Sequence, residues 1–248
     1  FNTYTAEDQL KEAFEFFEKM VHHQDEPIAD CVCVPLYYVS KLLKDSGTTV
    51  VQVGEGSDEL YCGYQNYANY LEVYRKYYQP AQYIPQFVKK SGSWLAAKTF
   101  PSKKYHLALL EQWASNKHLF WSGALAFSEE WKQSIMPAPQ EEFDPVLEKI
   151  YPGLDQRLDS YAIVEYHLKK LYELDPSADF LKSMAYLEFE QRLPELLLMR
   201  VDKMTMATSV EGRVPFLDHK HVEFAFQVPS SLKYKNKETK YILKKAAE

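Results

Sequence analysis

A short run of β-branched residues between a helical pattern and a glycine-rich turn constrains this chain most. Apolar residues recur at helical spacing in residues 35–46, and Gly47 stands where that helix would end. Residues 48–53 then have the composition of a strand, and residues 54–56, Gly-Glu-Gly, follow directly. Open parallel sheets bind ligands at the carboxyl ends of their strands. The order of these features therefore predicts an α/β unit with a ligand-binding edge near residue 54.

The remainder of the chain is predicted to be mostly helical. No later stretch has a strand signal comparable to that of residues 48–53, and Pro and Gly residues mark loops between the helical windows. We therefore predict one α/β domain with a strand-bearing segment that carries the ligand-binding edge, residues 1–66, and a mostly helical region, residues 67–248. The main helical windows are residues 5–24, 105–120, 158–174, 178–198 and 217–226.

Charge and hydropathy argue against several classes of partner. The chain has 29 Lys and Arg against 35 Asp and Glu, a formal net charge of -6. This balance predicts no broad surface for nucleic acid or for an anionic membrane, since both need clustered basic side chains. No window approaches the roughly 18 to 20 consecutive apolar residues of a spanning helix, and the first residues lack a signal-peptide pattern. We expect a soluble, cytoplasmic protein whose three cysteines are reduced and buried.

The densest group of polar residues is VGEGSDELYCGY, residues 53–64. Glycines on either side of Glu55 permit left-handed backbone angles and close approach of a ligand. Glu55, Asp58 and Glu59 would repel one another in a dry site unless a cation or a basic side chain lay among them. Magnesium with a nucleotide would supply that cation. The alternative is a solvated acidic loop at the start of the next helix.

A second candidate segment spans residues 196–220 and begins LLLMRVDKMTMA. Arg200 and Lys203 lie three residues apart on a helix rich in Leu and Met, so they are predicted to share a partly dry face. A lysine in such a place is stabilised by an anion, which suits a group that faces phosphate or a developing oxyanion. A solvated helix lysine is the alternative interpretation.

Taken together, the two segments resemble the asparagine synthetase family and its amide-forming relatives, which include the β-lactam synthetases. The resemblance runs through DEPIADCVCVPLYYVSKLLKDSGTTVVQVGEGSDELYCGY and VDKMTMATSVEGRVPFLDHKHVEFAFQVP, with a weaker echo in KYILKKAAE. It implies part of an ATP pyrophosphatase-type parallel sheet, similar to that of the adenine nucleotide alpha hydrolases, beside a large helical region. It also implies that a carboxylate, by default that of aspartate, is adenylated by ATP and captured by ammonia to give an amide, by default asparagine.

Residue roles follow from the positions that match the family pattern. The resemblance implies that Asp58 is a magnesium ligand, that Glu55 assists amide formation and that Lys203 stabilises charge during adenylation. Gly54, Glu55 and Gly56 match the segment that binds the nucleotide. ATP and magnesium are therefore the expected cofactors. The expected partners are a small-molecule carboxylate, ammonia and a glutaminase domain elsewhere in the parent chain, with no nucleic acid and no membrane.

The sequence also departs from the family pattern. It contains no SGGxDS pyrophosphate loop, Val53 replaces the usual Ser, and Cys62 replaces the first Gly of Gly-Gly-Tyr. Phe1 in place of Met, and a helical pattern that continues to Glu248, lead us to interpret the chain as a fragment of a parent ligase that is inactive alone. Two alternatives remain: a β-lactam-synthetase-like enzyme that uses another amine, motivated by Val53, and a non-catalytic binding module, motivated by the missing loop.

Overall fold

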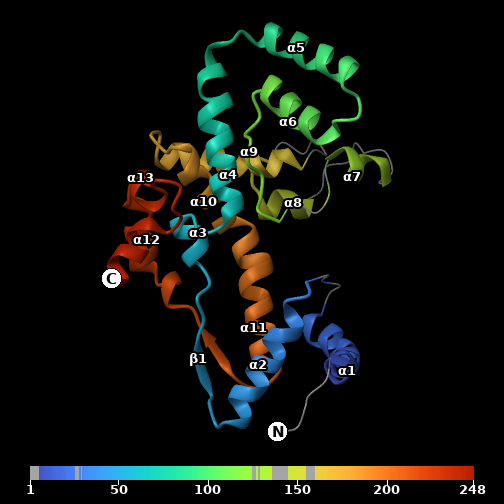
Figure 1. The fold of residues 1–248 in the computed structure, drawn as a ribbon, viewed down its shortest axis with the longest axis vertical. Coiled ribbons are helices and arrows are strands. Elements are labelled where there is room, and N and C mark those ends of the chain that lie inside the picture. The colour runs from blue at the N-terminus through green and yellow to red at the C-terminus, as the bar shows by residue number, and fades with distance from the viewer. Residues whose placement is uncertain are drawn as a thin grey trace. The chain divides into compact units, whose positions relative to one another are not determined.

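A computed structural model describes residues 6–25, 28, 30–124, 127, 129–135, 145–154 and 160–248 (Figure 1). The chain divides into two compact units, each built from two separate stretches of sequence. Unit 1 comprises Phe1–Ser57 and Leu193–Ala225, and unit 2 comprises Asp58–Arg192 and Phe226–Glu248. Most described residues are helical, and the sheet among them is small and parallel, so the α/β class is confirmed.

Unit 1 contains the parallel strand pair, β1 (Val50–Gln52) and β2 (Glu211–Arg213), with Val51 opposite Gly212. The strand predicted at residues 48–53 is confirmed as β1. We predicted no strand comparable to it after residue 64, and β2 was missed because three residues of sequence Glu-Gly-Arg have neither β propensity nor room for an alternating pattern. Whether these strands belong to a larger ATP pyrophosphatase-type sheet stays a prediction.

Unit 1 also contains three helices, α1 (Ala6–Gln24), α2 (Cys33–Asp45) and α11 (Met199–Met206), which pack on one another beside the strand pair. Figure 1 shows α11 beside α2, and α11 also contacts α1 and β2. A small core of Phe16, Met20, Cys33 and Met204 joins the three helices. The ring of Phe16 stacks on that of Tyr37, with centroids 4.0 Å apart.

The end of α2 follows the predicted turn chemistry. Gly47 has a φ of +86°, its N–H donates to the carbonyl of Lys44 at 2.9 Å, and the N–H of Thr48 donates to Leu43 at 2.9 Å. Glycine at the left-handed position after a helix is the usual helix terminator. The turn therefore leads the chain from α2 directly into β1. Unit 1 is completed by a π-helical turn (Leu193–Leu198), a 3-10 turn (Pro215–Leu217) and the start of α12 (His219–Gln227).

The regular secondary structure in the described part of unit 2 is helical, apart from an isolated bridge between Lys235 and Glu238. Short π-helical (Tyr74–Tyr78) and 3-10 (Pro80–Tyr83) segments link α4 (Gln65–Val73) to α5 (Gln86–Thr99). The windows predicted at residues 105–120, 158–174 and 178–198 contain α6, α9 and α10. No helix in the described part of the chain is long and apolar enough to cross a membrane. The helices of unit 2 are α3 (Ser57–Tyr61), α4 (Gln65–Val73), α5 (Gln86–Thr99), α6 (Lys104–Ala114), α7 (Glu129–Ile135), α8 (Pro145–Ile150), α9 (Tyr161–Leu174), α10 (Phe180–Glu190), α13 (Ser230–Lys233) and α14 (Tyr241–Ala247).

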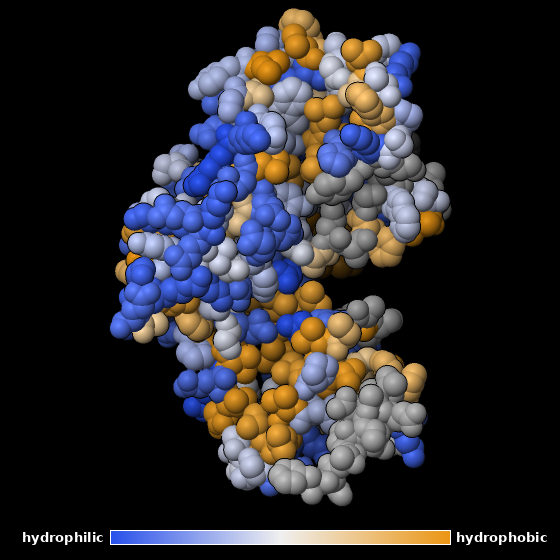
Figure 2. All heavy atoms as spheres, viewed as in Figure 1, coloured by the Kyte–Doolittle hydropathy of each residue, from blue (hydrophilic) through white to orange (hydrophobic). Residues whose placement is uncertain are grey.

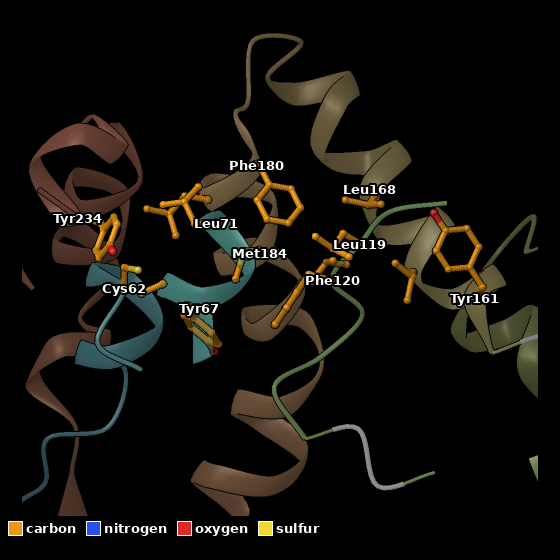
Figure 3. Packing of buried hydrophobic residues seen from close by; sticks show 14 residues of the cluster. Cys62, Tyr67, Leu71, Leu119, Phe120, Tyr161, Leu168, Phe180, Met184 and Tyr234 are labelled. Carbon is orange, nitrogen blue, oxygen red and sulfur yellow. The ribbon is translucent and has the colours of Figure 1, made fainter. Parts of the chain in front are cut away.

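The core of unit 2 lies between α4, α9 and α10. Figure 3 shows Tyr67 of α4 near Phe120, and the two rings meet edge to face with centroids 5.5 Å apart. Phe180 and Met184 of α10 belong to the same buried cluster. Cys62, just after α3, and Tyr67, Ala68 and Leu71 of α4 belong to this core, which holds that part of the chain in place.

The three cysteines are free thiols. Cys33 and Cys62 are buried, as predicted, whereas Cys31 is exposed, so the prediction was wrong for Cys31. Cys31 precedes the first turn of α2, and its side chain therefore lies outside the packed face of that helix.

Candidate functional site

Glu55 lies just beyond the carboxyl end of β1. The N–H of Val53 still donates across to β2 at 2.7 Å, so the strand pairing runs up to the residue before Gly54. Gly56 has a φ of +89°, and a Cβ at this position would overlap the side chain of Leu217. Only glycine meets both conditions without strain. The Gly-Glu-Gly turn therefore stands at the sheet edge where the sequence predicted it.

Arg200 of α11 joins Glu55 to Asp30. Its Nη1 donates to Asp30 Oδ2 at 2.7 Å, and its Nη2 lies 3.3 Å from Glu55 Oε1. The side chains of Arg200, Asp30 and Glu55 expose only 11%, 15% and 19% of their surface. Burial alone disfavours the charged guanidinium, but the two carboxylates outweigh burial and raise the pKa of Arg200 above its usual value. Arg200 is therefore a permanent counter-charge for Glu55.

The carboxylate of Glu55 keeps acceptor capacity that a ligand could use. Within the described ranges, Arg200 is the hydrogen-bonding partner of its carboxylate, whereas an ionised carboxylate can accept about four hydrogen bonds. A Cβ built on Gly54 would have no heavy atom within 4 Å. Chemically, this arrangement is a held carboxylate with spare acceptor capacity, one residue after a glycine whose Cβ position is open, and such a carboxylate can take up a proton from a bound group.

Lys203 lies at the C-terminal end of α1. Its Nζ donates to the carbonyl oxygen of Gln24, the last residue of that helix, and is 3.4 Å from Asp25 Oδ2. A lysine in this position satisfies a carbonyl that has no partner within the helix and interacts favourably with the helix dipole. The structure thus gives Lys203 a structural contact, and it brings Arg200 rather than Lys203 to the carboxylate of Glu55.

Asp58, in α3, pairs with Lys240 within unit 2. The Lys240 Nζ is 2.9 Å from Asp58 Oδ1. A Cβ built on Gly63 would overlap both Asp58 Oδ1 and Lys240 Cε, so glycine at this position lets the two side chains meet. Lys240 has a φ of +52° and its N–H donates to the carbonyl of Tyr61 at 3.2 Å, which fixes it before α14.

Two basic residues of the site were therefore not given roles by the sequence reasoning. Lys240 was missed, and its signal was the short KYILKKAAE echo near the C-terminal end. Arg200 was noticed only as a neighbour of Lys203. Asp30 lies inside the DEPIAD stretch that carries the resemblance, but nothing local distinguishes it from Asp25.

Each of the three acidic residues predicted to repel one another, Glu55, Asp58 and Glu59, has a basic or phenolic partner. Glu55 has Arg200, Asp58 has Lys240, and the buried Glu59 accepts a hydrogen bond from Tyr64 Oη at 2.8 Å. Burial, and then the charge of Glu59, raise the pKa of Tyr64, so the phenol stays protonated as a donor. The expectation that a cation or basic side chain lies beside these acids is confirmed for Glu55 and Asp58. The boundary between the units falls after Ser57, so Glu55 belongs to unit 1 and Asp58 to unit 2.

Asp58 fits one part of a magnesium site. Magnesium usually binds one or two carboxylates together with substrate phosphates and retains several waters. The Asp58 side chain is 33% exposed, so its carboxylate can be reached from solvent. No group of three or more His, Cys, Asp and Glu side chains that could hold a metal is found among the described residues. A magnesium ion held by Asp58 would therefore need phosphate oxygens and water as its other ligands.

Comparison with known proteins identifies one family and several relatives. The family model for asparagine synthase matches residues 3–248. Asparagine synthetase (glutamine-hydrolyzing) 1 of Bacillus subtilis (strain 168) is 34% identical over 231 residues, covering 93% of this chain and 32% of that protein. A putative asparagine synthetase (glutamine-hydrolyzing) of Mycobacterium tuberculosis (strain ATCC 25618 / H37Rv) is 29% identical over 93% of this chain and 31% of that protein.

A relative with a different name also aligns along the chain. Amidase chyE of Penicillium rubens is 26% identical over 252 residues, covering 94% of this chain and 34% of that protein. The chain spans about a third of the length of these curated relatives. No solved structure matches it.

Proposed function

This chain belongs to the asparagine synthase family, and from that premise we propose that it forms part of the synthetase site of an ATP-dependent amide-forming ligase. In the proposed reaction a substrate carboxylate, by default the side chain of aspartate, attacks ATP and displaces pyrophosphate. Ammonia then attacks the acyl carbon of the adenylate, nitrogen loses a proton, and AMP leaves with the electron pair of the broken acyl–oxygen bond. The product is an amide, by default asparagine.

The observation that carries this proposal is the position of Glu55 beyond β1. A proton must leave the attacking nitrogen, and Glu55, which follows the open turn residue Gly54, has acceptor capacity to spare. Arg200 supplies a positive counter-charge 3.3 Å from Glu55, and an ionised carboxylate is an acceptor that can take up a proton. We therefore propose Glu55 as the base of the amide-forming step and Gly54 and Gly56 as the backbone that admits the nucleotide.

The adenylation step needs positive charge beside the phosphates. Magnesium, when bound, would neutralise phosphate oxygens, and Asp58 would be one of its ligands. From the family resemblance, Lys203 is the lysine proposed to stabilise charge during adenylation. Lys240 is a second candidate on geometry, because it contacts the proposed magnesium ligand directly.

Lysine variants of the full-length parent protein test this proposal. Pyrophosphate release would be measured with ATP, magnesium, aspartate and ammonia. We expect Lys203→Ala to abolish release, and Lys44→Ala to be the matched control, since Lys44 also donates to a backbone carbonyl in unit 1, that of Ser209 at 3.1 Å. Lys240→Ala has Lys244→Ala as its control, because Lys244 pairs with Glu238 at 3.3 Å in the same region.

The activities of the two variants show which lysine stabilises charge during adenylation. Full activity in Lys203→Ala with loss in Lys240→Ala would move the stabilising role to Lys240 and leave Lys203 as a helix cap. If the unmodified protein is active and both variants keep full activity, the proposed role in adenylation is contradicted for each lysine. The 248-residue chain alone should release no pyrophosphate, because its sequence has no SGGxDS run.

The identity of the amine is a separate proposal. Val53, half-buried beside the turn, presents an apolar side chain where the family pattern has a hydroxyl, which motivates the alternative of a substrate other than aspartate or an amine other than ammonia. Mass spectrometry of the products formed from a panel of carboxylates and amines would decide between them. No product from any pair, in a full-length protein that binds ATP, would favour the non-catalytic binding module.

A further inference from the structure

Helix α5 turns its apolar side toward solvent. Phe87 and Trp94 expose 74% and 60% of their surface, and Val88 and Leu95 expose 45% and 60%. Residues one, seven and eight positions apart lie on one side of an α-helix, so these four form a continuous stripe along α5. A helix at the surface of a protein normally buries such a stripe against the core.

The opposite side of α5 packs inward through polar contacts. Lys89 is the buried residue of this helix. Its Nζ donates to Asn116 Oδ1 at 3.0 Å and lies 5.2 Å from the centre of the Trp113 ring, at the end of α6. The orientation of α5 is thus fixed by contacts of its own, and the apolar stripe is left outside.

The stripe continues into both neighbouring turns. Tyr83 and Ile84 before α5, and Phe100 after it, are also exposed large hydrophobic residues. Figure 1 places α5 at one end of unit 2, and Figure 2 shows hydrophobic side chains interspersed with polar ones at the same end. We call this surface the α5 face, made of Tyr83, Ile84, Phe87, Val88, Trp94, Leu95 and Phe100. Contiguous exposed apolar surface of this kind marks an interaction site.

The same part of the chain is strongly basic. Residues 73–110 contain no Asp or Glu and seven basic residues, Arg75, Lys76, Lys89, Lys90, Lys98, Lys103 and Lys104. The whole chain carries -6, so the remaining residues carry -13, which is -6 minus +7. The net charge that predicted no anionic-membrane surface is therefore an average over two very different regions.

Basic and aromatic side chains are interleaved on this surface. The Nζ of Lys98 lies 4.0 Å from the centre of the Trp94 ring, and that of Lys103 lies 5.7 Å from the centre of the Phe100 ring. Lys90 is exposed beside them. Trp and Phe with flanking Lys are the composition of helices that lie in a membrane interface, where rings enter the acyl boundary and lysines reach the headgroups.

We propose that the α5 face binds the surface of a bilayer that contains anionic lipid, with α5 lying in the plane of the interface. Anionic headgroups complement the exposed lysines beside the stripe, Lys90, Lys98 and Lys103, whereas a second copy docked through the same face would bring like charges together. The acyl boundary of the bilayer would also cover the apolar stripe, whereas a hydrophilic, acidic protein bound to the same lysines would leave the stripe exposed. This contact does not rest on the proposed ligase function.

Vesicle flotation tests the proposal with the 248-residue chain. Vesicles of phosphatidylcholine mixed with phosphatidylglycerol would be compared with vesicles of phosphatidylcholine alone, at low and at high salt. We expect the chain to float with the anionic vesicles at low salt, to float less at high salt, and to stay in solution with the neutral ones.

Paired variants separate charge from apolar contact. Lys90→Gln with Lys98→Gln should weaken binding about thirtyfold, since each lysine near an anionic surface contributes about fivefold. Trp94→Ser with Leu95→Ser should weaken it more than tenfold. The controls are Lys149→Gln with Lys169→Gln, and Leu174→Ser, which alter exposed residues elsewhere in unit 2. Unchanged circular dichroism would verify that each variant is folded.

Brominated lipid gives a direct readout of insertion. It should quench the fluorescence of Trp94, and Trp94→Phe should keep vesicle binding while losing most of the quenching. Equal binding to neutral vesicles, or equal loss in the control variants, would overturn the proposal. Absence of vesicle binding would also overturn it, and self-association abolished by Leu95→Ser would then assign the α5 face to a second copy.

Discussion

Each unit contains a glutamate paired with an arginine, but the two glutamates differ in how many groups donate hydrogen bonds to them. In unit 2, Glu188 is fully buried and accepts from four groups, which are Tyr67 Oη, the Gly123 N–H at 2.6 Å, Ser122 Oγ at 3.2 Å and Arg192 Nη1 at 3.0 Å. In unit 1, Glu55 keeps 19% of its surface exposed, and its contact with Arg200 is 3.3 Å long. A carboxylate whose acceptors are filled stabilises a fold, whereas one with acceptors to spare is available to a substrate.

Replacing each glutamate by alanine tests this comparison directly, and the Glu188 variant should show the largest loss of stability. Glu188→Ala leaves the Arg192 guanidinium and the Tyr67 hydroxyl without their partner, and we expect it to lower the free energy of unfolding of unit 2 by about 3–5 kcal/mol. Glu55→Ala should cost less than about 1 kcal/mol in unit 1, because Arg200 keeps Asp30.

The sequence supplies a separate probe for each unit. All four tryptophans, Trp94, Trp113, Trp121 and Trp131, lie in unit 2, so their fluorescence during urea unfolding reports on that unit. Protection of the buried Cys33 thiol, measured by mass spectrometry, reports on unit 1. A Glu188→Ala loss no larger than the Glu55→Ala loss would remove the distinction between a filled and an unfilled carboxylate.

Acid should weaken unit 2 through a second buried group, His118. Burial lowers the pKa of its imidazole to about 4 from an ordinary 6.5, partly offset by a hydrogen bond with the carbonyl of Phe120. Between these values the unfolded chain binds more protons than the folded one, so stability is lost as the pH falls from 6.5 to 4. We expect a loss of up to about 3 kcal/mol, followed by tryptophan fluorescence.

A variant at the same position identifies the source of this pH dependence. His118→Asn removes the titrating ring and the 2.8 Å contact with Ser183 Oγ, so it should lower stability at neutral pH. Its free energy of unfolding should then change less between pH 6.5 and pH 4 than that of the unmodified chain. An identical slope in both proteins would assign the acid sensitivity to other groups.

A smaller effect should come from Arg200 in unit 1. Arg200→Ala leaves Asp30 and Glu55 partly buried without a cation, and we expect a loss of about 1–2 kcal/mol in Cys33 protection. Arg200→Lys should recover part of it. Arg213→Ala is the matched control, because Arg213 pairs with Glu211 at 2.8 Å but is 63% exposed. A control loss as large as that of Arg200→Ala would mean that the burial of the ion pair adds nothing.

Local features of the chain were determined by the sequence. The order helix, Gly47, strand, Gly-Glu-Gly could be predicted because helical periodicity, β-branched residues and left-handed glycines act on neighbouring residues. That order also places Glu55 at the end of a strand. The family resemblance came from the same short segments, since each carries its pattern within a few turns of chain.

Which distant groups meet was decided only by the tertiary structure. Arg200 reaches Glu55 across 145 positions, and Lys240 reaches Asp58 although nothing local connects them. β2 was missed for the same reason, since a three-residue strand exists only through its partner. The sequence also shows that α5 has an apolar stripe, but periodicity does not state which way a stripe points. Its outward orientation depends on Lys89 packing against α6, a contact that forms only when the chain is folded.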